Sequence, residues 1–142
     1  MIRAAEWCLR LGLGFTLVSA VADRFGLWGG PGAPNVSWGD WAHFVKYCGL
    51  LNGFLPSGWA APLAWMATVA ESLCAVGLIS GLLLRFAAYG SFVLLTLFAA
   101  AMTISLGIKP PLNLSVFVDA AAALLLAAIL ESRNTVPRTQ LK

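Results

Sequence analysis

The sequence predicts an all-α polytopic membrane protein. We expect a four-transmembrane-helix bundle with a short extracytoplasmic amphipathic helix between the first and second spans, folded as one domain over residues 1–142. Of the 142 residues, 60% are hydrophobic and only 11% are charged, whereas soluble domains carry about 25% charged residues. The apolar residues are grouped in long runs that charged residues separate, and about 20 such residues cross a bilayer as a helix. Lipid is therefore expected to cover much of the surface.

The first apolar run is the weakest candidate span, which we place at about residues 4–28. Between Arg10 and the next charge only residues 11–22 are uncharged. That length also suits a cleaved signal peptide, and the small residues 20–22 resemble a cleavage site, so a signal peptide is the alternative. We favour a spanning helix because residues 25–28 continue the apolar pattern. Arg10 would then extend to the interface or pair inside the bundle.

The other three runs are longer. Residues 60–84 and 86–108 are separated by one charge, Arg85, which predicts two spans joined as a tight antiparallel hairpin. The fourth span is predicted at residues 111–130. It follows Lys109-Pro110-Pro111, and prolines suit a helix start because the first N–H groups of a helix have no partner inside it.

Four spans place both termini on the same side of the membrane. Loops rich in Lys and Arg face the cytoplasm, so both termini and the polar tail, residues 131–142, are predicted to be cytoplasmic in a bacterial-type inner membrane. Six of the nine basic residues lie on that side: Arg3, Arg10, Arg85, Arg133, Arg138 and Lys142.

The long connection, residues 29–59, is predicted to lie outside. It starts with a Gly- and Pro-rich turn region, and then Ser37 and Asp40 form an S-x-x-D capping pattern. An apolar face at helical spacing follows: Trp41, Phe44, Val45 and Cys48. The simplest interpretation is a helix that lies on the membrane and caps the bundle. The alternative is a lid or docking surface formed by Trp28, Trp38 and Trp41.

Glu71 is the charged residue that the pattern singles out. It is the one charge within residues 60–84. Placing a carboxylate inside a bilayer costs about 2.5–3.5 kcal/mol on insertion scales, so such residues usually face protein or a wet cavity and are functional candidates. Glu71 is therefore the candidate catalytic residue.

Several other polar residues are predicted to lie at the height of Glu71. Counting a rise of about 1.5 Å per residue from the cytoplasmic helix ends brings the acidic residues of three spans to similar depths. We predict a direct Arg24–Glu71 contact. Two roles stay open: a charge-paired clamp that fixes helix packing, or a site where a protonated carboxyl donates a proton. The predicted polar layer comprises Asp23, Arg24, Glu71 and Asp119, with Lys109 and His43 as further members.

The three cysteines predict no redox or metal centre. Cys8, Cys48 and Cys74 lack C-x-x-C spacing, and His43 has no second ligand at a suitable spacing. We therefore predict packing cysteines and no metal. The basic residues are scattered at the ends of apolar runs, a pattern that favours membrane anchors over nucleic-acid binding.

A family resemblance extends these predictions over residues 9–128. The segment Arg10-Leu-Gly-Leu-Gly-Phe15 resembles an R-x-x-L-G-x-x-F element, and the run from Glu71 to Arg85 has the pattern E-x5-G-L-x2-G-L-x2-R. Residues 21–29 and 102–109 are also similar to segments of the same family. The order of these features resembles the DoxX/DoxD-like family of small four-helix membrane proteins.

The resemblance implies a role beside redox enzymes. Some DoxX-like proteins are membrane subunits of quinone-linked oxidoreductases, which implies quinone as a ligand and a redox protein as a partner. Relatives with thiol–disulfide roles depend on paired cysteines, which this chain lacks. We expect a quinone-linked subunit, whether or not the chain is itself an enzyme. The alternatives are a non-enzymatic scaffold, a protein that binds a lipid-like ligand, and, third, a small-solute transporter. Membrane lipids and a second copy of the chain are the other expected partners.

Overall fold

The computed structural model describes residues 1–135, and every regular element in that range is helical. The all-α prediction is therefore confirmed. Three of the helices, α1, α3 and α4, are long and apolar enough to cross a membrane. The elements are α1 (Ile2–Arg24), α2 (Trp41–Leu51), the 3-10 turn η1 (Ser57–Trp59), α3 (Ala60–Ser80), α4 (Leu84–Leu106), α5 (Lys109–Asn113) and α6 (Val116–Thr135).

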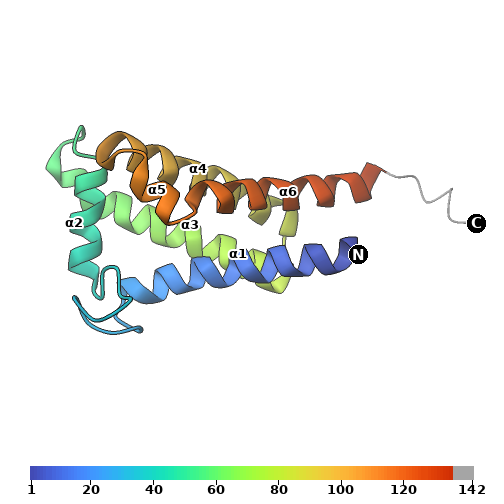
Figure 1. Ribbon diagram of the computed structural model, residues 1–142, viewed down its shortest axis with the longest axis horizontal. Helices are drawn as coiled ribbons and strands as arrows, with labels where there is room; N and C mark the ends of the chain where they lie inside the picture. The colour runs from blue at the N-terminus through green and yellow to red at the C-terminus, as the bar shows by residue number, and fades with distance from the viewer. Residues whose placement is uncertain (136–142) are drawn as a thin grey trace, which may run out of the picture.

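The long helices run side by side, and α2 lies across one end of them (Figure 1). The most extensive contact joins α4 to α6, followed by α1 with α3 and α3 with α4, whereas α1 and α6 touch less. The N-terminus and the end of α6 lie at the end opposite α2 (Figure 1). Small and branched apolar side chains fill the centre, among them Leu17, Ala75, Leu78, Ala88, Ala123 and Leu126.

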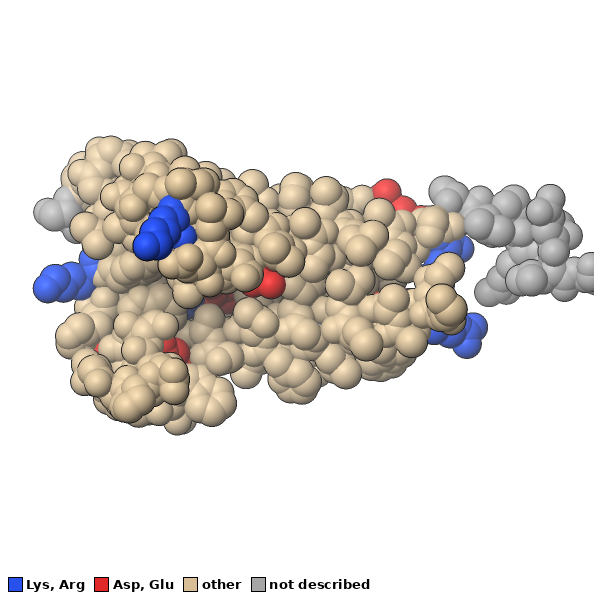
Figure 2. Space-filling model, in the orientation of Figure 1, with Lys and Arg blue, Asp and Glu red and all other residues tan. Residues whose placement is uncertain are grey.

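The outer faces of the long helices are apolar. Leu73 on α3 and Phe86 and Leu97 on α4 are each more than 60% exposed. Figure 2 shows a largely uncharged surface along the middle of one face, with Lys and Arg atoms toward both ends. A surface of this kind is suited to hydrocarbon and not to water.

Helix ends differ from the predicted boundaries because backbone geometry stops a helix before its apolar pattern ends. The first helix ends at Arg24 and not at residue 28. The second predicted span ends at Ser80, because Gly81 adopts φ +81°, the left-handed conformation common just past helix ends. Helix α4 ends at Leu106 and is followed by Gly107, whose φ is +85°; the span was predicted to end at residue 108.

The prediction of one continuous helix over residues 111–130 is wrong. The segment is divided into α5 and α6 by Ser115, whose φ is +57°. Pro110 occupies the first turn of α5, as expected for proline near a helix start. The predicted tail begins inside α6, which continues to Thr135, and residues 136–142 lie outside the described part of the chain.

Helix α2 is amphipathic as predicted, but its N-cap is Asp40 and not Ser37. The Asp40 carboxylate accepts the backbone N–H of His43 at 2.8 Å. This hydrogen bond, reinforced by the His43 ring, lowers the pKa of Asp40. On the inner face Phe44 and Cys48 are buried against Ala64 of α3, so α2 is attached firmly to the end of the bundle.

Candidate functional site

A buried ion pair joins the end of α1 to the middle of α3. The Arg24 guanidinium pairs through Nη2 with Oε2 of Glu71, and both side chains are at most 3% exposed. Arg24 Nη1 also donates a hydrogen bond to the Thr68 hydroxyl at 2.7 Å, which in turn donates to the carbonyl of Ala64 at 2.8 Å. The predicted Arg24–Glu71 contact is confirmed.

Aromatic rings cover the guanidinium. Its central carbon lies 3.8 Å from the centroid of the Phe44 ring and 5.4 Å from that of Trp38. The two rings themselves meet edge to face at 5.0 Å. A cation over an aromatic face is attracted by the ring quadrupole, and more strongly when water is excluded. The outer connection and α2 thus close a lid over the ion pair.

Asp23 holds the outer connection in place. One of its carboxylate oxygens, Oδ2, accepts the backbone N–H groups of Ser37 and Trp38 at 2.9 and 3.1 Å. The other oxygen, Oδ1, and Nε of Arg24 are buried with no hydrogen-bond partner among the described residues. We refer to the whole group as the Arg24 cluster, which consists of Asp23, Arg24, Trp38, Phe44, Thr68 and Glu71.

Three members of the predicted polar layer lie elsewhere. Asp119 on α6 faces a groove beside α1, Lys109 is exposed at the start of α5, and His43 is exposed and pairs with Asp40 at 2.8 Å. The rise along a helix gives the depth of a residue but not the direction in which it points. Because α6 packs mainly on α4 and not on α3, similar depth does not bring Asp119 to Glu71.

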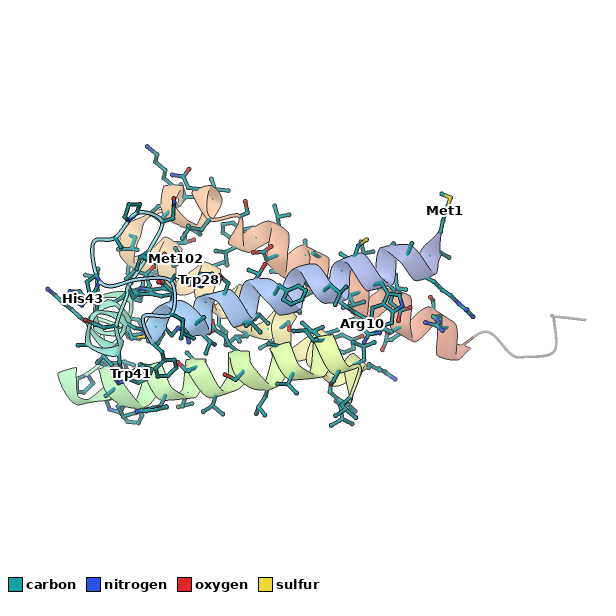
Figure 3. The ribbon with its side chains drawn as sticks, turned by 90° about the horizontal axis from the view of Figure 1, so that it is seen from below. Met1, Arg10, Trp28, Trp41, His43 and Met102 are labelled. Carbon is teal, nitrogen blue, oxygen red and sulfur yellow. The ribbon has the colours of Figure 1, made fainter. Side chains whose placement is uncertain are left out.

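The three tryptophans of the alternative lid or docking surface have different environments. Trp38 belongs to the lid, and Trp41 packs 4.4 Å from Trp65 and is stacked on Phe25. Trp28 is 61% exposed, and its Nε1 donates to the carbonyl of Ser19. Figure 3 shows Trp28, Trp41 and His43 at the same end of the molecule, with Arg10 toward the other.

Sequence reasoning did not assign three neighbours of the ion pair to the site. Thr68 precedes Glu71 by three residues and so shares its helix face, which is a usable signal. Phe44 and Cys48 were visible as the apolar face of a helix, but nothing in the sequence aimed that face at Arg24. Burial raises the pKa of the Cys48 thiol to about 11, although Arg24 nearby acts in the opposite direction.

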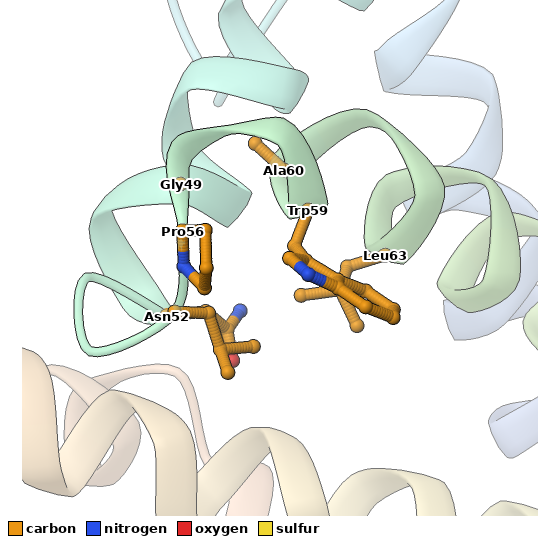
Figure 4. Close-up of a pocket in the computed structure, with 7 residues that line it drawn as sticks. Gly49, Asn52, Pro56, Trp59, Ala60 and Leu63 are labelled. Carbon is orange, nitrogen blue, oxygen red and sulfur yellow. The ribbon is translucent and has the colours of Figure 1, made fainter.

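Two hollows are of interest, and both are small. One, of about 20 Å³, lies beneath the end of α2 among Gly49, Asn52, Pro56 and Trp59 (Figure 4), and it has room for about one water molecule. The other is an open groove of about 220 Å³ between α1 and α6. Pockets for drug-sized ligands are usually about 300–1,000 Å³, so neither hollow resembles a large cofactor pocket.

The opposite end of the bundle carries a different set of charges. Arg10 donates through Nε to the carbonyl of Leu78 at 3.0 Å and, over a longer 3.4 Å, to that of Ile79. It therefore caps the end of α3, where carbonyls lack partners within the helix. Arg10 is thus bonded inside the bundle, one of the two predicted alternatives. The neighbouring ion pairs are Glu6–Arg133 at 2.5 Å and Arg85–Glu131 at 2.6 Å.

The Arg24 cluster holds two carboxylates: Glu71, which pairs with Arg24, and Asp23, which accepts backbone N–H groups of the outer connection. No group of three or more His, Cys, Asp or Glu side chains gathers within residues 1–135. The arrangement can therefore hold helices together electrostatically. A water-accessible form of the same site could relay a proton through the Glu71 carboxyl.

Comparison with known proteins corrects the family prediction. Residues 2–113 match the family model described as methylamine utilisation protein MauE. Comparison with curated proteins and with solved structures found no match. The predicted DoxX-like identity is wrong, because the model that matches is that of a different family. Glycines and isolated charges in apolar helices recur in many small membrane proteins, so the motifs that suggested DoxX were not specific. The chain belongs to the MauE family of methylamine utilisation proteins.

Proposed function

We propose that this chain is an integral membrane component of a methylamine-utilisation system and that it acts there as a scaffold for a partner protein. The family description supports the system. The observation that supports the scaffold role is the Arg24 cluster, in which the contacts of Arg24 and Asp23 join separate segments of the chain. Such contacts hold a surface in one shape, which lowers the cost of ordering it when a partner binds.

We further propose that α1, α3, α4 and α6 all cross the membrane as a four-helix bundle in one domain, residues 1–142. Although α6 carries three charged residues, Glu131 and Arg133 lie near its end and are paired with other helices. Its long contact with α4 supports a fourth span. Both termini are then cytoplasmic in a bacterial-type inner membrane, and α2 faces the other side.

The shape of the outer end supports partner binding. Asp23 fixes the backbone at Ser37 and Trp38, and Arg24 fixes the lid through Phe44. Beyond the lid, large aromatic side chains remain exposed, including Trp28 and Trp59 at 61% and 52%. Exposed tryptophans suit either lipid headgroups or a protein interface, and a rigid aromatic surface at one end of the bundle provides both.

A quinone-linked redox role is the second candidate. The observation that favours it is Glu71, a buried carboxylate inside a membrane helix, since quinone reduction consumes protons. In that case Glu71 would supply a proton, and electrons would come from a partner protein. Neither hollow is as large as an ordinary ligand pocket, so a quinone would have to bind on the lipid-facing surface or displace the lid.

Replacing the ion pair by apolar side chains separates the two candidates. Substituting both partners of a buried ion pair by residues of similar volume is often neutral or stabilising. The double variant Arg24→Met/Glu71→Leu should therefore keep the clamp function and remove proton chemistry. We expect cells that lack the gene to fail to grow on methylamine, and the double variant to restore growth.

Loss of growth with a normally folded double variant would favour the redox candidate. Normal growth of the deletion strain on methylamine would contradict membership of a methylamine-utilisation system itself. The matched control is Arg85→Gln/Glu131→Gln, which removes an exposed ion pair at the other end and should restore growth under either candidate.

A further inference from the structure

The groove between α1 and α6 is open and elongated. Along α1, residues at four-residue spacing line the groove. A Cβ added at Gly12 would meet no atom within 4 Å apart from its chain neighbours and the backbone of its own helix turn. Along α6, Asp119 and Ala122 form the facing wall. The space of about 220 Å³ is bounded by the remaining lining residues, Cys8, Leu9, Leu13 and Thr16.

Asp119 is the unusual member of this lining. Its side chain is half-buried, and the described residues offer it no side-chain hydrogen bond or ion pair. Thr16 cannot serve as its donor in this arrangement, because the Thr16 hydroxyl donates to the carbonyl of Gly12 at 3.0 Å. A polar side chain in a membrane helix normally faces a partner, whereas Asp119 has only the N-terminal end of its own helix, α6, to favour its charge.

Because the groove lies deep in the membrane, an Asp119 carboxylate without an ion-pair partner is costly there. Thr16 lies 14 residues after Ile2 and 8 before Arg24, or about 21 Å and about 12 Å from the two ends of α1. Asp119 therefore borders the interior of an approximately 30 Å hydrocarbon layer. Water is scarce at that depth, and a cationic side chain would relieve the cost of the carboxylate.

The described residues of the long helices in a second copy of the chain do not supply this cation. Among the described residues of the long helices, Arg10 caps α3, and Arg24 pairs with Glu71. Arg85 and Arg133 are likewise paired, and Arg3 lies in the first turn of α1, far from the depth of Asp119. A homodimer through this groove would bring two carboxylates together. The exposed bases Lys46 on α2 and Lys109 at the start of α5 lie outside the long helices that form the groove.

We infer that the α1–α6 groove is a docking site for a transmembrane helix of another protein, one that presents a Lys or Arg side chain to Asp119. Gly12 and Ala122 are small, which permits close approach of a helix backbone. The open groove follows about two turns of α1, a shape that matches a ridge of side chains on a helix. This inference rests on the groove alone and goes beyond the proposed scaffold role, which concerns the outer end.

Photo-crosslinking in native membranes tests the inference. A genetically encoded diazirine amino acid replaces Gly12, where the open space accepts a side chain, and the matched control places the same residue at Thr96, an exposed position on α4. We expect the Gly12 probe to crosslink to an apolar segment of another protein that contains Lys or Arg, and the control to label lipid. Crosslinks only to lipid, to this chain itself, or to a segment without a basic residue would overturn the inference.

Charge exchange then tests the role of Asp119. Asp119→Asn should lower the crosslink yield about tenfold or more, since the carboxylate is the group that a buried cation requires. Asp119→Lys combined with an acidic residue at the partner's basic position should restore it. An unchanged yield in Asp119→Asn would overturn the inference.

A second variant covers the case in which Asp119→Asn does not accumulate in the membrane. Ala122→Leu keeps the carboxylate but fills the groove, so it should also abolish crosslinking from Gly12. It should at the same time leave Cys8, the exposed cysteine at the groove, open to N-ethylmaleimide. Retained crosslinking in Ala122→Leu would show that the helix docks elsewhere.

Discussion

The two ends of the helix bundle use the same carboxylate–guanidinium chemistry in opposite surroundings. At the α2 end, Arg24 and Glu71 are 2% and 3% exposed and lie beneath aromatic rings. At the other end, the side chains of Arg85 and Glu131 are 51% and 43% exposed. Water screens the second pair, whereas the first pair has exchanged its hydration for contacts with protein. Burial, and not the type of residue, sets how much each pair matters to the fold.

The two ends of the bundle should also differ in how well they tolerate substitutions. The lid end depends on a few contacts that were formed at the cost of desolvation, so removing one partner leaves the other charge buried without its ion-pair partner. The opposite end spreads its charges over two ion pairs and the Arg10 cap, each partly in contact with solvent or neutral carbonyls. The change in the free energy of unfolding that a substitution causes should therefore differ by several-fold between the two ends.

The largest effect is expected from breaking the buried pair on one side. Glu71→Leu leaves the Arg24 guanidinium buried without its anion, which should lower the free energy of unfolding by about 3–5 kcal/mol. Denaturant unfolding in detergent would measure the change. The control, Arg24→Met/Glu71→Leu, should recover most of the stability. A fully stable Glu71→Leu variant would contradict the claim that burial makes this ion pair important to the fold.

The next prediction concerns how well the lid excludes reagents. With its pKa raised to about 11, the Cys48 thiol is only about 0.1% ionised at pH 8, because each pH unit below the pKa lowers the thiolate fraction tenfold. We expect N-ethylmaleimide to modify Cys48 at least about a hundredfold more slowly than an ordinary exposed cysteine. The rate should rise tenfold per pH unit up to the pKa.

Mass spectrometry of the alkylated peptides measures this rate. Phe44→Ala removes the ring that covers Arg24 beside Cys48 and should accelerate the reaction. Equal rates for Cys48 and for an exposed thiol in the unaltered protein would show that the lid is open.

A smaller effect is expected from the Arg10 cap at the other end. Arg10→Met removes the hydrogen bonds to the carbonyls of Leu78 and Ile79 while keeping an unbranched side chain over Trp7. Leaving such carbonyls without a donor should cost about 1–3 kcal/mol. Hydrogen exchange should quicken at the turn between α3 and α4, and Arg10→Lys should restore part of the protection. Unchanged exchange in Arg10→Met would mean that water replaces the cap.

The smallest effect is expected from the exposed ion pair. Arg85→Gln should change the free energy of unfolding by no more than about 1 kcal/mol, because exposed pairs contribute little and salt screens them. Glu131 also keeps a hydrogen bond with Tyr89. The same denaturant titration, at low and high salt, would measure the difference. A loss as large as that of Glu71→Leu would remove the distinction between the two ends.

Local patterns were sufficient for several features of the molecule. Long apolar runs predicted α1, α3 and α4, and a 3.6-residue spacing predicted the buried face of α2. The single acid in a long apolar segment marked Glu71, and helix rise placed it level with Arg24, so their contact could be predicted. These results follow from quantities that each helix carries on its own: length, periodicity and distance along its axis.

Other features depended on how the helices were arranged around one another. Depth alone put Asp119 beside Glu71, whereas the packing of α6 on α4 directs it to a different groove. The short motifs that suggested the DoxX family were equally unable to identify the relatives of the chain. The break between α5 and α6 at Ser115 could not be predicted either, because an apolar run indicates where side chains avoid water and not where the backbone changes direction.

The sequence by itself determined that this chain forms apolar helices, places an amphipathic helix between the first two long ones, and carries one acid deep in α3. Only the tertiary structure decided which side chains cover the Arg24–Glu71 pair and which carboxylate was left alone. The physical reason is that hydrophobicity and helix rise are properties of single segments, while the direction of a side chain toward a neighbour is set by the rotation of each helix and by its packing partners.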